Sequence, residues 1–237
     1  MIPKVIHYCW FGKNKKSRLI EKCIESWRKY APDFEIKEWN EENFDIDISP
    51  YVRQAYEQKK WAYISDYARF YILNKYGGIY LDTDVELIKP IDALLENDSF
   101  AGFSQPAIVA TGLIFGCNKD NWLCAEVLKS YEGEVFDFSS PEKVLAIGRR
   151  VTAILTENGL KTDGTYQVIN GTAIYPKEYF NPTDGDMHAR IDSKAYSVHH
   201  YAATWFPAHK RILNTLRRFI GSKTMEKYYK VKHKIIK

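Results

Sequence analysis

The chain has 237 residues, of which 45% are hydrophobic and 27% charged, with a formal net charge of +4. This length and composition suit a globular protein with one large core and exclude a disordered or fibrous chain. No stretch approaches 18 consecutive apolar residues, and the first residues lack a long apolar segment. We therefore expect neither a membrane-spanning helix nor a signal peptide.

In chain order, the first expected elements are a strand that ends in a loop within 4–12, a helix at 17–30, a strand at 34–39, a helix that opens at Ser49-Pro50, and a helix at 61–76. Ser17 is a suitable N-cap, and proline at position 50 suits a first helical turn. Gly77 and Gly78 end the long helix, because glycine readily adopts the positive φ that closes a helix.

The next expected strand, "GIYLDTD" at 78–84, carries two aspartates one residue apart. Side chains alternate along a strand, so Asp82 and Asp84 are expected on the same face, roughly 7 Å apart. Two carboxylates that close repel each other unless a cation lies between them. The motif therefore indicates a cation site, provided that its surroundings support one.

Further strands are expected at 99–104 and 110–116, followed by helices at about 120–132 and 141–157. Short strands are expected near 166–175 and 195–200. The alternation of strands and helices in the first hundred residues predicts an α/β fold, with a mostly parallel sheet and helices on both faces. Ligands of such sheets bind beyond the carboxyl ends of the strands. Trp10, Asp82 and Asp84 all fall at such ends.

Asp66 and Arg69 lie three residues apart in the long helix and share one of its faces. Such a pair on an exposed face would have only a structural role. This helix, however, leads through a tight turn into the aspartate motif, which brings the pair near the same cleft. The sequence contains neither GxxxxGK[ST] nor GxGxxG, so any phosphate would be bound through a metal such as Mg²⁺ or Mn²⁺.

Three segments, "IPKVIHYCWFG", "SDYARFYILNKYGGIYLDTD" and "HHYAATW", together resemble the glycosyltransferases with a DXD sugar-binding motif. That family includes bacterial capsule enzymes, fungal mannosyltransferases and, more distantly, the glucosylating domain of large clostridial toxins. The resemblance covers roughly residues 1–206. It implies a GT-A fold, in which a Rossmann-like nucleotide-binding half is joined to an acceptor-binding half.

The resemblance also implies roles for individual residues. Donor-binding residues would be Cys9, Trp10, Ser65, Asp66, Arg69, Tyr80 and Asp82. The metal, Mn²⁺ or Mg²⁺, would be held by Asp82, Asp84 and His200, with His199 as the alternative. Catalysis would depend on Asp66, Arg69, Asp82, Asp84 and Trp205. Many relatives have serine before that tryptophan, whereas this chain has Thr204.

The implied activity is metal-dependent transfer of a sugar, with retention of configuration, from a nucleotide-sugar to a hydroxyl acceptor. A UDP-hexose is favoured as donor, and GDP-mannose remains open. The acceptor would be a glycan or a lipid-linked sugar in surface or capsular polysaccharide synthesis. The alternative is a non-catalytic protein that binds nucleic acid or anionic lipid and retains the DxD motif as a relic.

Residues 207–237 form a distinct basic segment, expected to be an amphipathic helical tail after a catalytic domain at 1–206. From residue 208 it holds ten Lys or Arg residues against one acid, Glu226, whereas the rest of the chain is mildly acidic. This clustering disfavours nucleic acid as a partner, because nucleic-acid binding spreads basic and aromatic residues over a surface. The tail would contact an anionic membrane or pack on the protein body.

The four cysteines, Cys9, Cys23, Cys117 and Cys124, form no CxxC pair. They also have no histidine at metal-binding spacing, so free thiols in a reducing compartment are expected. With the basic tail, this predicts a cytoplasmic protein, with peripheral contact at the inner face of the membrane.

Overall fold

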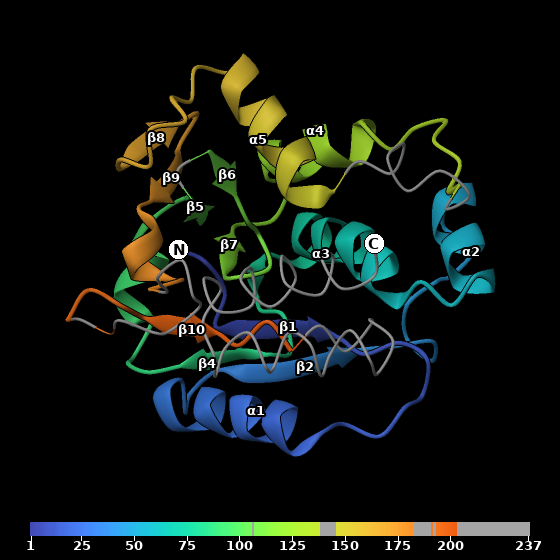
Figure 1. The fold of residues 1–237 in the computed structure, drawn as a ribbon, viewed down its shortest axis with the longest axis horizontal. Helices are drawn as coiled ribbons and strands as arrows, with labels where there is room; N and C mark the ends of the chain where they lie inside the picture. Colours follow the sequence, from blue (N-terminus) through green and yellow to red (C-terminus); the bar gives the residue numbers. More distant parts are fainter. Residues whose placement is uncertain (106, 138–145, 183–190, 192, 203–237) are drawn as a thin grey trace, which may run out of the picture.

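A computed structural model describes residues 1–105, 107–137, 146–182, 191 and 193–202 (Figure 1). Thr204, Trp205, the predicted tail at 207–237 and residues 141–145 of the helix expected at 141–157 lie outside these residues. Within the described ranges, no helix has both the length and the apolar character needed to cross a bilayer.

The fold contains both helices and strands. The helices are α1 (Arg18–Tyr30), α2 (Pro50–Glu57), α3 (Trp61–Tyr76), α4 (Trp122–Lys129) and α5 (Ile147–Glu157), with short 3₁₀ helices η1 (Asp92–Glu96) and η3 (Lys177–Tyr179). The strands are β1 (Val5–Cys9), β2 (Glu35–Trp39), β3 (Gly78–Tyr80), β4 (Val85–Leu87), β5 (Ser99–Gln105), β6 (Ile108–Val109), β7 (Phe115–Cys117), β8 (Gln167–Ile169), β9 (Thr172–Tyr175) and β10 (Ser197–His199).

The helices predicted from capping residues are confirmed. The Ser17 hydroxyl accepts a hydrogen bond from the Ile20 amide at 3.4 Å, and α1 begins at the next residue. Ser49 caps α2 in the same way through the amide of Val52, at 3.2 Å. Both caps satisfy amides that the first helical turn leaves without partners.

The main sheet has the strand order β2-β1-β3-β7-β5-β9-β8, with β6 paired to β5. Pairing is parallel for β1 with β2, β1 with β3, and β5 with β9. The short strand β7 runs antiparallel to both of its neighbours. Strands β4 and β10 form a separate antiparallel pair. Pairing is also antiparallel for β5 with β6 and for β8 with β9. The expected α/β class is confirmed, and these antiparallel pairs are a feature that the sequence pattern did not indicate.

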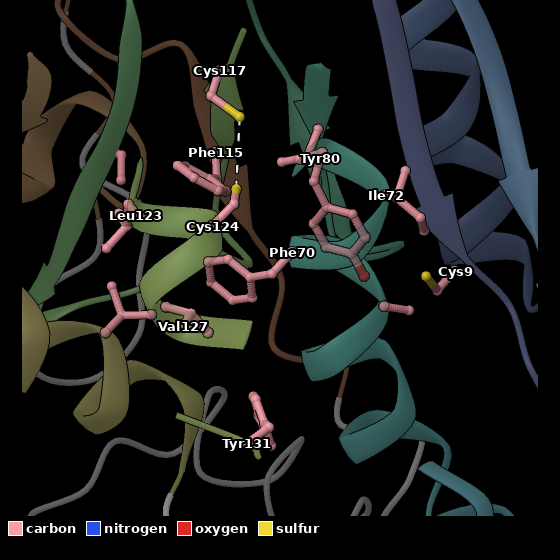
Figure 2. Packing of buried hydrophobic residues seen from close by; sticks show 14 of the residues in the cluster. Cys9, Phe70, Ile72, Tyr80, Phe115, Cys117, Leu123, Cys124, Val127 and Tyr131 are labelled. Carbon is pink, nitrogen blue, oxygen red and sulfur yellow. Dashed lines mark hydrogen bonds between the residues drawn. The ribbon is translucent and has the colours of Figure 1, made fainter. Parts of the chain in front are cut away.

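Two hydrophobic cores lie on opposite faces of the sheet, so the expectation of helices on both faces is confirmed (Figure 1). One core includes Ile20 and Trp27 of α1 together with β4 and η1. The other lies under α2, α3, α4 and α5. Figure 2 shows its centre, where the rings of Phe70 and Phe115 pack with their centroids 5.5 Å apart. Helix α3 is thereby fixed against the middle of the sheet.

The strand expected at 110–116 is shorter in the structure. Its first residues form a turn instead, in which the Leu113 amide donates to the Ala110 carbonyl at 3.4 Å. Strand pairing begins only at Phe115. The apolar run continues through the turn because Leu113 and Ile114 are themselves buried, which is why the pattern overstated the strand.

The turn between α3 and β3 depends on two glycines and a buried histidine. Gly78 has φ +105°, and a Cβ there would lie 2.8 Å from the Val5 carbonyl oxygen and 2.9 Å from Nε2 of His7. Trp39 Nε1 donates to His7 Nδ1 at 3.1 Å, so the ring proton lies on Nε2 and is donated to the Gly77 carbonyl at 3.0 Å. Burial lowers the pKa of His7 to about 4, so the ring stays neutral.

Candidate active site

The two aspartates of the DxD motif lie beyond the end of β3, where the chain turns toward β4. The Val85 amide donates to the Asp82 carbonyl at 3.0 Å and closes this turn. The expectation that Asp82 and Asp84 share one face of a strand is therefore wrong, because strand pairing stops at Tyr80. The two carboxylates enter different environments.

Arg69 of α3 is at the centre of the first environment. Its Nη2 donates to Asp66 Oδ1 at 2.7 Å and to Asp82 Oδ1 at 3.2 Å. The guanidinium lies over the Tyr80 ring, 4.7 Å from its centroid, and the Arg69 side chain is only 4% exposed. The structure thus brings together the predicted residues Asp66, Arg69 and Asp82, because the guanidinium of Arg69 bonds to both carboxylates.

Burial and charge act against each other on these acids. Burial raises the pKa of Asp66 to about 6, although the Arg69 charge opposes the shift. Burial also raises the pKa of Asp82, again opposed by Arg69. Because burial outweighs the charge of the one guanidinium that the two carboxylates share, both are easier to protonate than free aspartate.

Gly112 closes this environment and was not identified as a site residue from the sequence. Its carbonyl accepts a hydrogen bond from the Asp82 amide at 3.0 Å. A Cβ at Gly112 would lie 2.0 Å from Asp82 Oδ2 and 3.0 Å from Arg69 Nη1. The glycine is required for this close approach. The one available signal was a Thr-Gly pair before an apolar strand, which is too common to single out a site.

The second environment surrounds Asp84 and is built by the end of β10. His199 Nε2 lies 3.0 Å from Asp84 Oδ1, and the Ala202 amide donates to Oδ2 at 2.7 Å. The His200 amide donates to the Asp84 carbonyl at 2.9 Å. Although burial opposes the shift, the charge and hydrogen bond of His199 and the Ala202 amide lower the pKa of Asp84 to about 2.

The structure does not place His200, the expected metal ligand, beside the Asp84 carboxylate. His200 Nε2 instead lies 2.7 Å from Glu86 Oε2. Because β10 pairs with β4 so that His199 is opposite Val85, neighbouring histidines point to different sides. The residue beside Asp84 is the alternative, His199.

Asp84 and His199 fit a divalent cation by their chemistry and their spacing. Neighbouring ligands of an octahedral cation with bonds of about 2.1 Å lie roughly 3 Å apart, and Asp84 Oδ1 and His199 Nε2 are separated by 3.0 Å. Among the residues that the structure describes, no three histidine, cysteine or carboxylate side chains gather into a complete set of ligands. A cation here would complete its shell with phosphate oxygens and water, as Mg²⁺ often does.

The other predicted donor-binding residues lie around these two environments. Trp10 follows β1 and is partly exposed; its Nε1 donates to the Asn14 carbonyl at 2.7 Å. The Ser65 hydroxyl donates to the Trp61 carbonyl at 3.1 Å within α3. Cys9 and Tyr80 are buried, with 6% and 1% exposure. Of these two residues, Tyr80 contributes to the site, because its ring lies against the Arg69 guanidinium.

Fold and site together define an α/β protein with a DxD turn. The first aspartate of the turn, Asp82, is bridged to Asp66 by Arg69, and the second, Asp84, pairs with His199. Residues 17–101 match the family described as the glycosyltransferase sugar-binding region containing DXD motif. The predicted resemblance to DXD glycosyltransferases is confirmed over this segment, which includes α3 and both aspartates.

Two curated relatives share part of the chain. Inositol phosphoceramide mannosyltransferase 3 of Schizosaccharomyces pombe is 27% identical over 147 residues, which are 59% of this chain and 40% of the relative. Inositol phosphoceramide mannosyltransferase 1 of the same organism is 31% identical over 110 residues, or 42% of this chain and 33% of the relative. The chain thus spans well under half the length of these curated relatives.

The solved structure of the PaToxG glycosyltransferase supports the fold assignment. It superposes with a TM-score of 0.51 at 18% sequence identity, and the match covers 66% of this chain and 68% of the other. The likeness extends to the fold alone. It supports the α/β architecture that the sequence resemblance predicted.

Proposed function

We propose that the protein is a glycosyltransferase that moves a sugar from a nucleotide-sugar donor to a hydroxyl acceptor with retention of configuration. One observation carries the proposal: Arg69 bridges Asp66 and Asp82 within the segment that matches the DXD family. Asp84 of the same segment pairs with His199, which lies beyond it. The site thus combines the buried guanidinium of Arg69, carboxylates that can accept hydrogen bonds from sugar hydroxyls, and the Asp84–His199 pair, which suits a divalent ion.

Each residue has a proposed role. Asp66 and Asp82 accept hydrogen bonds from hydroxyls of the donor, and Arg69 donates to its phosphate while Tyr80 supports the guanidinium. Asp84 and His199 hold Mn²⁺ or Mg²⁺, with Asp82 near the coordination shell. When bound, the cation would supply Lewis-acid stabilisation of the diphosphate.

The nucleotide is proposed to lie against the end of β1. Trp10 has a partly exposed ring suited to stacking on a base, and Ser65 and the Cys9 backbone flank it. Trp205, outside the described residues, stays a predicted donor of a hydrogen bond to the leaving phosphate. UDP-hexoses are the favoured donors. A mannose donor belongs in any test, because both curated relatives are named mannosyltransferases.

The acceptor is proposed to be a glycan or a lipid-linked sugar in surface polysaccharide synthesis. The two relatives are named for a lipid, inositol phosphoceramide, which makes a lipid-linked acceptor the first to examine. Contact of residues 208–237 with the cytoplasmic face of a membrane would bring the site to such an acceptor. The domain boundary after residue 206 and this membrane contact remain predictions.

The decisive experiment measures hydrolysis of UDP- and GDP-sugars without an acceptor, with Mn²⁺ and again with EDTA. Wild-type protein should hydrolyse one donor slowly and only with the metal. Asp84→Asn should abolish this hydrolysis, because the amide lacks the charge that the cation requires. Asp120→Asn is the matched control, since its carboxylate is 77% exposed and outside the site.

If no donor is hydrolysed, calorimetry measures whether the protein binds UDP or GDP in the presence of Mn²⁺. Binding that is lost with EDTA and in Asp84→Asn would support an enzyme that needs its acceptor. Failure of wild-type protein to bind either nucleotide would sink the glycosyltransferase proposal.

A further inference from the structure

Tyr201 has an unusual backbone conformation at the edge of the site, with φ +46°. This left-handed conformation is uncommon outside glycine and is strained for a bulky side chain. Such strain persists only where the surrounding structure holds it, and it is concentrated at functional sites. The contacts of Tyr201 therefore indicate what the strain supports.

The side chain of Tyr201 is held from one side by Asn181. Nδ2 of Asn181 donates to the Tyr201 hydroxyl at 2.6 Å and to the Ser104 carbonyl at 3.1 Å. Asn181 is only 2% exposed, so its amide is a fixed point that connects the end of β5 to the segment after β10. The hydroxyl of Tyr201 is thereby tied to the main sheet.

The ring of Tyr201 packs on His199. The two ring centroids are 4.0 Å apart, at an interplanar angle of 49°. His199 in turn places Nε2 at 3.0 Å from Asp84 Oδ1. A continuous series of contacts thus runs from Asn181 through Tyr201 and His199 to Asp84.

The strained backbone has a second effect on Asp84. The turn at Tyr201 brings the next amide, that of Ala202, to 2.7 Å from Asp84 Oδ2, while the His200 amide reaches the Asp84 carbonyl at 2.9 Å. One short segment therefore holds both carboxylate oxygens of Asp84 and its main chain. A relaxed backbone at Tyr201 would redirect the Ala202 amide.

We propose that Tyr201 is a positioning residue that orients the His199 imidazole and the Asp84 carboxylate, and so sets the affinity of the site for a divalent cation. The inference rests on the proposed function, because it concerns the cation of that same site. Groups that orient metal ligands without touching the metal change affinity about 10- to 100-fold when they are replaced.

The test measures the affinity of the protein for Mn²⁺ in the presence of UDP. The electron paramagnetic resonance signal of free Mn²⁺ gives the Kd. Tyr201→Asn removes the ring but keeps a residue that tolerates positive φ. Its Kd for Mn²⁺ should rise about 10- to 100-fold. Tyr201→Phe keeps the ring and loses the bond to Asn181, so its Kd should rise by less.

Tyr166→Asn is the matched control, because the Tyr166 side chain is 52% exposed and packs on Tyr175, away from Asp84. Its Kd for Mn²⁺ should equal that of wild-type protein. Thermal unfolding of all variants separates loss of metal affinity from loss of fold. If Tyr201→Asn fails to fold, Tyr201→Phe decides alone.

Each result has one meaning. Wild-type affinity in Tyr201→Asn, or in Tyr201→Phe where that variant decides, would overturn the positioning role and leave the proposed function intact. A wild-type protein that binds UDP but no Mn²⁺ would overturn the metal dependence and this inference together. A graded loss of affinity, with the control unchanged, supports the proposal.

Discussion

Arg69 carries one positive charge between two carboxylates, and its surroundings make that charge hard to replace. The Arg69 side chain is 4% exposed, whereas those of Asp66 and Asp82 are 17% and 30% exposed. Removal of the guanidinium would leave two negative charges close together with little solvent to screen them. The single arginine thus holds two partly buried acids together, and it is the charge that we propose to bind the donor phosphate.

Arg69→Met is expected to lower the free energy of unfolding by about 2 to 3 kcal/mol near neutral pH, somewhat less than for a fully buried pair because both acids are partly exposed. The loss should shrink as pH falls toward 5, since protonation of Asp66 and Asp82 removes the uncompensated charge. Urea denaturation at several pH values measures both effects.

The control for this substitution is Arg53→Met. Arg53 also faces two acids, Asp47 and Glu57, but all three side chains are more than half exposed. Exposed ion pairs contribute little, so the control should change stability by no more than about 0.5 kcal/mol. An equal loss in both variants would contradict the argument for Arg69.

Gly112→Ala tests the close approach of the Ala110–Leu113 turn to Asp82. The new methyl group would lie 2.0 Å from Asp82 Oδ2, so the carboxylate must move away from Arg69. We expect at least a tenfold loss of UDP affinity in calorimetry, about 1.4 kcal/mol, with the fold retained.

Gly148→Ala is the matched control for this substitution. Its new methyl group would meet the Ile108 side chain at 3.0 Å, away from the site. Nucleotide affinity should be unchanged in that variant. Unchanged affinity in Gly112→Ala as well would show that the turn does not shape the donor site.

At the scale of elements, His7 joins three segments that position the DxD turn. It accepts from Trp39 of β2, lies on β1, and donates to Gly77 at the end of α3. A neutral ring is required for this arrangement, because the protonated ring could not accept from Trp39. The turn into β3 is therefore sensitive to acid.

His7 should make the protein less stable as pH falls from about 6.5 toward 4. Its pKa in the folded protein is about 4, against 6.5 for an ordinary histidine, so the unfolded chain binds the proton first. The contribution is fully present above about pH 6.5 and amounts to roughly 3 kcal/mol. Denaturation curves across this range measure it.

His7→Leu is the comparison for this prediction. It should be less stable than wild-type protein near pH 7 by about 1 to 3 kcal/mol, because the Trp39 indole N–H and the Gly77 carbonyl lose their partner. The difference between the two proteins should narrow as pH falls toward 4. A constant difference across that range would contradict the assigned role of the imidazole.

The elements that the sequence predicted well are those with local signals. Helices α1 and α2 begin after the capping serines Ser17 and Ser49, and α3 ends at its glycine pair. The short strands near the site were harder, because β3, β4 and β7 have three residues each. Their limits depend on partners far away in the sequence.

The site shows the same division. The motif identified Asp66, Arg69, Asp82 and Asp84, since spacing within one helix and one turn is local. The choice between His199 and His200 was beyond the pattern, because it depends on the pairing of β10 with β4, more than a hundred residues earlier. Gly112 and Tyr201 were missed for the same reason: each matters only through a distant contact.

At the scale of the whole molecule, the reactivity of the four thiols tests the packing of the core under α3, which contains Cys9, Cys117 and Cys124, and of the buried face of α1, which carries Cys23. Cys9, Cys23, Cys117 and Cys124 are all buried and unpaired by disulfides, and burial raises the pKa of Cys9 and of Cys23 to about 12. Buried thiols of this kind are unreactive. An aromatic disulfide reagent should therefore modify the thiols of the folded protein slowly. After denaturation the same reagent should modify all four thiols rapidly. Fast reaction of any thiol in the folded state would contradict this packing.

The pairing of β4 with β10 has a consequence for the order of events during synthesis. Asp84 emerges from the ribosome long before His199 and Ala202, and chain growth of about 5 to 20 residues per second makes the interval several seconds or more. The nascent chain can form α3 and the arginine bridge early, but the aspartate–histidine pair must wait for the later segment. A translation product released before residue 199 would contain the whole DXD region and still lack half of the proposed cation site.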